Sequence, residues 1–101
     1  MSRYFVSRDA DVDLDAIWAF IARDNFETAE RVDREFSKVF ESLARMPEQG
    51  YRRRDLSKRL MRFFPLYSYL IIYQPVDAAI QILAVIHGNR NLKRLLKERL
   101  F

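Results

Sequence analysis

The segment that decides the fold of this chain spans Phe64–Arg90 and reads FPLYSYLIIYQPVDAAIQILAVIHGNR. It contains two runs rich in β-branched and aromatic residues, 69–73 and 80–86, which are separated by a turn that begins at Pro75. Such runs, bounded by turn residues, are typical of paired β-strands. The first run is apolar almost throughout, so we expect a central strand that is buried on both faces. The second strand delivers the chain's one histidine, His87, to a glycine turn.

Two amphipathic helices are predicted in the front half of the chain. Four aspartates crowd the start of the first helix, where carboxylates suit the positive end of the helix dipole. This helix stops near Asp24, and Asn25 can cap a second helix that ends at Pro47. So short a connection predicts an antiparallel hairpin. The residues expected to form the core, from their helical and strand spacing, are Leu14, Ile17, Ile21, Val32, Phe36, Val39, Phe40, Leu70, Ile72, Ile82 and Ala84.

Short strands are also predicted at residues 4–6 and 60–64. After Asn91, leucines at helical spacing among basic residues predict a tail helix. We expect the sheet and hairpin to fold without this tail, because the proposed core lies upstream. The chain is therefore expected to form one α+β domain over residues 1–101. An N-terminal strand leads into an antiparallel helical hairpin, which packs on a mostly antiparallel β-sheet, and a short C-terminal helix follows.

Composition narrows the class of protein. The chain has 101 residues, of which 50% are hydrophobic and 32% charged, and this balance is typical of a compact domain with one modest core. The absence of cysteine excludes disulfides and thiolate metal sites. We expect a cytoplasmic protein, because residues 1–6 lack the apolar stretch of a signal peptide and no apolar run approaches the length of a membrane span.

Charge is divided unevenly between the two halves. Residues 1–50 carry 7 Lys or Arg and 11 Asp or Glu, whereas residues 51–101 carry 11 and 3. A field of this kind favours an anionic partner, either nucleic acid or an acidic peptide. Two clusters supply most of the positive charge. The first contains Arg52, Arg53, Arg54, Lys58, Arg59 and Arg62, and the second contains Arg90, Lys93, Arg94, Lys97 and Arg99.

Three interpretations fit the first basic cluster. Its arginines could hold the carboxylates of an acidic protein partner through charge-assisted hydrogen bonds. They could instead blunt an exposed strand edge. With Tyr51 and Tyr67 nearby, they could also form the mixed basic and aromatic surface that binds nucleic acid. We rank the protein dock first and the strand edge second.

His87 also has two interpretations. It could act as the general acid of a phosphodiesterase, with Arg90, Arg62 and Arg59 stabilising the developing charge. A lone histidine at the end of a strand is more often structural, and here it can set the Gly88 turn. No metal site is expected. Asp9, Asp11 and Asp13 begin like a calcium loop, but the glycine and the final glutamate that such a loop requires are missing.

The order of these features resembles the ParE branch of the RelE/ParE superfamily, the toxins and plasmid stabilisation proteins of plasmid and chromosomal toxin–antitoxin pairs. The matching elements are the F-P-x-x-x-Y-L-I-x-Y pattern at 64–73 and the strand end at 86–90, Ile-His-Gly-Asn-Arg. The resemblance extends over nearly the whole chain. It implies the α+β fold described above.

The resemblance also implies a function. ParE-like proteins are type II toxins that act on DNA gyrase by binding, without a catalytic site or cofactor, and a cognate antitoxin neutralises them. The implied antitoxin has a ribbon-helix-helix N-terminus and an acidic amphipathic tail, and it forms a hetero-oligomer with the toxin. The residues expected to bind antitoxin or target are Arg52, Arg53, Arg54, Arg59, Arg62, His87, Arg90, Lys93 and Arg94.

Two alternatives remain open. The first is a RelE-like ribosome-dependent mRNA endonuclease with His87, Arg90, Arg62 and Arg59 as its catalytic set. RelE-type nucleases often carry a His or Tyr near the C-terminus, and the tail after Arg90 has neither. The second alternative is an antitoxin-binding domain that is not toxic.

Overall fold

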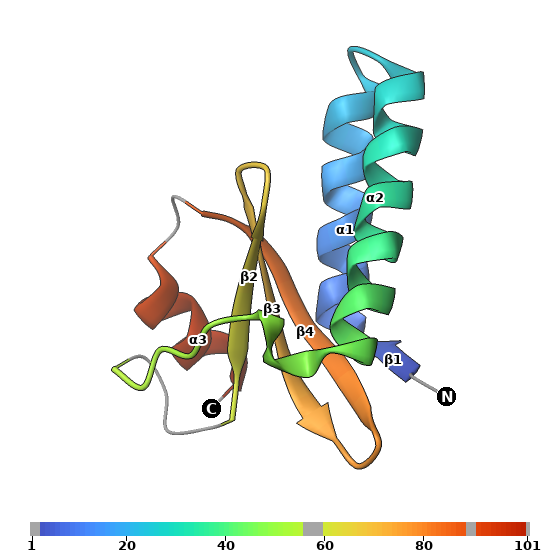
Figure 1. Ribbon diagram of the computed structural model, residues 1–101. Coiled ribbons are helices and arrows are strands. Elements are labelled where there is room, and N and C mark those ends of the chain that lie inside the picture. The colour runs from blue at the N-terminus through green and yellow to red at the C-terminus, as the bar shows by residue number, and fades with distance from the viewer. Residues whose placement is uncertain (1–2, 56–59, 89–90, 101) are drawn as a thin grey trace.

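The computed structural model describes residues 3–55, 60–88 and 91–100. Figure 1 shows a β-sheet with a long helical hairpin on one side and a short helix on the other. In the part of the chain that is described, no helix combines the length and the apolar character needed to cross a membrane. The elements, in chain order, are β1 (Arg3–Val6), α1 (Arg8–Ala22), α2 (Phe26–Arg45), the 3₁₀ turn η1 (Pro47–Gln49), β2 (Arg62–Leu66), β3 (Tyr69–Val76), β4 (Ala79–His87) and α3 (Leu92–Leu100).

The helical hairpin begins and turns at side-chain caps. The hydroxyl of Ser7 accepts a hydrogen bond from the Ala10 N–H at 3.1 Å, at the start of α1. The side chain of Asn25 accepts one from the Thr28 N–H at 3.0 Å, which confirms the predicted cap of α2. Each cap satisfies an N–H group that has no partner within its own helix. The caps therefore define the residues at which the two helices start. The helices lie antiparallel to each other (Figure 1).

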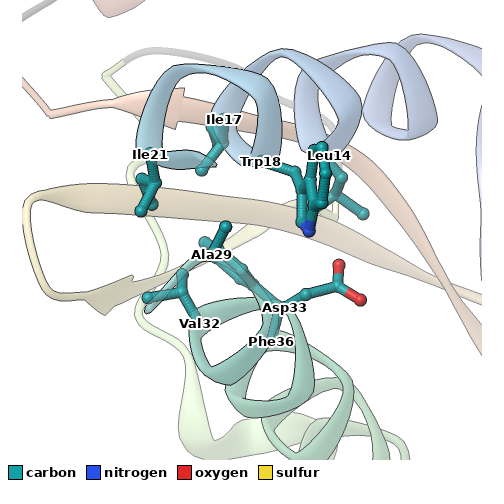
Figure 2. A pocket seen from close by; sticks show the side chains of 8 residues that line it. All are labelled: Leu14, Ile17, Trp18, Ile21, Ala29, Val32, Asp33 and Phe36. Carbon is teal, nitrogen blue, oxygen red and sulfur yellow. The ribbon is translucent and has the colours of Figure 1, made fainter. Parts of the chain in front are cut away.

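The interface between α1 and α2 is apolar and leaves no room for a water molecule. Figure 2 shows side chains of α1 directed toward those of α2, with Asp33 at one side. Trp18 of α1 also meets the ring of Phe26 edge-on, with 5.5 Å between the ring centroids. The residues that line this interface are Leu14, Ile17, Trp18, Ile21, Ala29, Val32, Asp33 and Phe36.

The four strands form one sheet in the order β1-β4-β3-β2. β1 runs parallel to β4, and the other two pairings are antiparallel, as expected for a mostly antiparallel sheet. In the central strand β3, Leu70–Tyr73 are all buried, which confirms the expected strand with two covered faces. The turns are tighter than predicted because Tyr67 and Asp77 adopt left-handed backbone with φ of 57° and 54°. Two-residue turns therefore suffice, so β2 continues to Leu66 and β3 continues past Pro75.

Each face of the sheet carries its own apolar cluster. One face packs against the hairpin and includes Phe36, Phe40, Ile71, Tyr73 and Ile82. The opposite face includes Leu70, Ile72, Leu83, Ala84 and Ile86 together with Met61, Phe63, Leu95 and Leu96. Most of the predicted core residues are buried in these clusters. Leu14, Ile17, Ile21 and Val39 are only partly buried, and they pack against the edge of the first cluster.

Helix α3 belongs to the core, contrary to the expectation from sequence. Its Leu95 and Leu96 are 8% and 2% exposed and pack in the second cluster, on the face away from the hairpin. The expectation that the core lies wholly upstream of the tail is therefore wrong. A short amphipathic helix is marginal alone, and the apolar sheet face supplies the packing that it needs.

Besides this apolar packing, the carboxylate of Asp13 links α3 to helix α1. Asp13 of α1 accepts two hydrogen bonds from the Arg99 guanidinium, both at 2.7 Å, and one from the Val85 N–H at 2.9 Å. The Val85 N–H needs this partner because β1, which borders β4, ends at Val6. The hydrogen bonds that Arg99 donates to Asp13 also raise the pKa of Arg99. The Asp13 carboxylate thus fixes the position of α3 and completes the edge of β4.

Candidate functional site

The first basic cluster begins beside the edge strand β2. Tyr51 and Phe63 exchange two backbone hydrogen bonds of 2.9 and 2.8 Å, and their rings stack with centroids 5.7 Å apart. This isolated bridge covers part of the β2 edge. Arg53 and Arg54 follow on the surface, where they are exposed.

Arg53 and Asp55 form a bidentate pair on the surface, with N–O distances of 2.9 and 2.7 Å. The hydrogen bonds from Arg53 hold the pKa of the Asp55 carboxyl below its usual value, and the charge of Lys93 on α3 acts in the same direction. Phe63, the bridge partner of Tyr51, packs in the same apolar cluster as Leu95 and Leu96, so the fold brings α3 toward the start of the first basic cluster. Lys93 and Arg94 are both exposed, and Arg94 pairs with Glu98 one helical turn away at 3.2 Å.

A buried tyrosine fixes the turn that leads into the basic cluster. The hydroxyl of Tyr73 donates a hydrogen bond to the Pro47 carbonyl at 2.6 Å and accepts one from the Gly50 N–H at 2.8 Å. A Cβ added at Gly50 would lie 2.4 Å from that hydroxyl oxygen, so only glycine fits there. The Gly50 carbonyl in turn accepts a hydrogen bond from Arg62 at 2.7 Å. This anchor was not predicted from the sequence, although a glycine soon after Pro47 is a signal that another group approaches the backbone closely.

His87 lies at the exposed end of β4. Its ring meets Tyr69 edge-on, with centroids 5.9 Å apart, and the following Gly88 N–H donates to the Ser68 carbonyl at 2.9 Å. His87 is paired with Tyr69 in the sheet, whereas Arg62 is paired with Tyr73. These two positions are four residues apart on β3, roughly 13 Å at about 3.3 Å per residue. The sheet therefore places His87 beside the first residue of β3 and Arg62 beside the middle of that strand.

Two members of the proposed site set, Arg59 and Arg90, lie outside the described residues, as do Lys58 and the first two residues of the chain. Among the residues that are described, no group of three or more His, Asp or Glu side chains is placed to hold a metal ion. Of the described candidates, Arg52, Arg53, Arg54 and Arg62 belong to the first basic cluster, Lys93 and Arg94 lie at the start of α3, and His87 lies at the end of β4.

Comparison with known proteins identifies the fold and the family. A solved structure described as a chromosomal ParDE toxin–antitoxin system from P. aeruginosa superposes with a TM-score of 0.71 and is 22% identical, covering 86% of this chain and 96% of that one. No curated protein matches the sequence significantly. The sequence model of the ParE toxins of type II toxin–antitoxin systems, parDE, matches residues 4–92. This chain therefore belongs to the family of ParE toxins of type II toxin–antitoxin systems.

Proposed function

We propose that this toxin arrests cells by binding DNA gyrase, without chemistry of its own. Its family membership suggests the target. The observation that favours binding over catalysis is the sheet register, which separates His87 from Arg62. A general acid and the cations that stabilise a developing phosphorane must reach the same phosphate group. A separation of four strand residues does not provide that arrangement.

We also propose that a cognate antitoxin with an acidic amphipathic tail neutralises the toxin in a cytoplasmic hetero-oligomer. The support is the basic region that the first cluster and α3 form together, on a chain whose second half is strongly cationic. An amphipathic partner helix could set its carboxylates against these cations while its apolar side packs on the toxin. The residues proposed to contact antitoxin or target are Arg52, Arg53, Arg54, Arg59, Arg62, His87, Arg90, Lys93 and Arg94.

A RelE-like ribosome-dependent nuclease is the second candidate function, because the imidazole of His87 is exposed on the sheet beside Tyr69. Toeprinting of translating ribosomes with purified toxin distinguishes the two candidates. We expect no codon-positioned cleavage of the mRNA, with a known ribosome-dependent nuclease as the positive control. Cleavage that disappears in the His87→Ala variant would overturn the binding proposal and assign the toxin to the nucleases.

A further inference from the structure

Arg52 differs from the other described arginines of the first basic cluster because one of its side-chain nitrogens, Nε, is buried and has no hydrogen-bond partner. The neighbouring Arg53 is paired with Asp55, and Arg62 donates to the Gly50 carbonyl. Leaving a buried donor unsatisfied costs about 1–3 kcal/mol, and more when the group is charged. Ordered water, an ion or a bound partner can satisfy such a group.

Arg52 lines a hollow of about 310 Å³, where η1 meets the first residues of β2 and the end of β3. Arg62 lines the same hollow, so two guanidinium groups border one space. Arg62 has further N–H groups to offer, because a guanidinium carries five and only one hydrogen bond from Arg62 is described. The hollow is otherwise largely apolar. Its lining residues are Pro47, Glu48, Arg52, Leu60, Arg62, Tyr73 and Pro75.

The charges around the hollow select the ligand. Two arginines and Glu48 leave one net positive charge, which a single carboxylate neutralises. A nucleic-acid strand carries a phosphate at every nucleotide, and its backbone would face Glu48 as well as the arginines. The proline, leucine and tyrosine surfaces suit the apolar part of a protein side chain. A planar carboxylate also matches the fork of a guanidinium.

We propose that this hollow receives the carboxylate of an Asp or Glu side chain from a protein partner, held by Arg52 and Arg62. The inference deepens the proposed function and rests on it for the identity of the partner, an acidic segment of the antitoxin. The carboxylate contact is inferred from the residues of the hollow and does not depend on which protein supplies the carboxylate. It makes Arg52 a residue that recognises the partner, whereas Arg45, which is exposed at the end of α2 and does not line the hollow, only adds to the positive field.

The test uses the full chain and two capped dipeptides that differ only in charge, acetyl-Leu-Glu-amide and acetyl-Leu-Gln-amide. Binding is followed by NMR through the Nε–Hε signals of the arginines, at constant ionic strength. We expect a saturable shift of the Arg52 signal with the Glu peptide. Affinity for the Gln peptide should be at least roughly tenfold weaker, as expected when a charge-assisted hydrogen bond is lost.

The matched variants are Arg52→Gln and Arg45→Gln. Arg52→Gln should reduce binding of the Glu peptide to the level of the Gln peptide, and Arg45→Gln should leave it unchanged. Backbone amide spectra report whether each variant remains folded, and Arg52→Lys repeats the test if Arg52→Gln does not fold. Equal shifts with the two peptides, equal effects of Arg52→Gln and Arg45→Gln, or tighter binding of inorganic phosphate than of the Glu peptide would overturn the proposal.

Growth assays separate this inference from the proposed function. If the unmodified chain does not arrest growth but its Arg52 signal still discriminates between the two peptides, the toxin role fails and the carboxylate site stands. If the chain arrests growth but the Arg52 signal does not discriminate between the peptides, the carboxylate site fails and the toxin role stands.

Discussion

A chain that ends at Asn91 is expected to lose most of its stability. The truncation removes Leu95 and Leu96, which cover the sheet face opposite the hairpin. Burial of a leucine side chain contributes about 1.5–3 kcal/mol, so the loss of two amounts to roughly 3–6 kcal/mol. It also leaves the carboxylate of Asp13, whose side chain is 11% exposed, without the Arg99 cation. Small domains are stable by only about 5–15 kcal/mol in total.

Urea unfolding of the truncated chain, beside the full chain, measures this loss. Leu96→Ala gives a graded version of the same change, and we expect it to cost about 2–5 kcal/mol. Lys97→Ala is the matched control, because Lys97 is the next residue of α3 and is exposed. A truncated chain within about 1 kcal/mol of the full chain would show that α3 is not part of the core.

Replacement of Tyr73 by alanine is the second change with a large expected effect. The side chain of Tyr73 is 0% exposed, and its removal should cost about 3–5 kcal/mol through the cavity that it leaves. Tyr73→Phe keeps the ring and removes only the hydroxyl, which leaves the Gly50 N–H and the Pro47 carbonyl unpaired. We expect that variant to cost about 1–3 kcal/mol in urea unfolding.

Tyr73 also predicts a dependence of stability on alkaline pH. Burial raises the pKa of Tyr73 above the ordinary value of a tyrosine. The folded state therefore holds this proton more tightly than the unfolded chain. The resulting stability is fully present below about pH 10, the unfolded pKa, and is lost as the pH rises through the folded pKa.

Two phenylalanine variants test this assignment. Tyr73→Phe should weaken the alkaline decrease in stability. Tyr67→Phe should largely keep it, because Tyr67 is exposed, although its hydrogen bond to Glu35 raises its pKa as well. An alkaline decrease that is unchanged in Tyr73→Phe would assign the effect to another group.

The sequence predicted the elements whose signals are local. Helical spacing of apolar residues and the cap at Asn25 located the hairpin, and the apolar run at 69–73 located the central strand. The contribution of α3 was not predictable, because leucine spacing shows that a helix has an apolar side but not which surface covers it. Asp13 has the same local context as Asp9, Asp11 and Asp15. Its distinct role depends on Arg99, 86 positions away.

The candidate site, too, could be predicted from the sequence only in part. Composition located the cationic half of the chain. The fold brings α3 toward the first basic cluster, because Phe63, the bridge partner of Tyr51, packs with Leu95 and Leu96. The separation of His87 and Arg62 follows from the register in which the strands pair. This register could not be predicted, because the order of the strands along the chain does not determine it. The buried Nε of Arg52 is likewise a consequence of the packing around it, since Arg53 and Arg54 follow it in sequence and are exposed.

This chain belongs to the ParE toxin family, and on that basis we propose that it acts by binding DNA gyrase. The most direct measurement is the supercoiling of relaxed plasmid by purified gyrase with ATP, titrated with purified toxin that arrests growth when expressed alone. We expect supercoiling to fall as toxin is added and to recover when the cognate antitoxin is supplied in equal amount. Full supercoiling in the presence of a large excess of such toxin would contradict the claim.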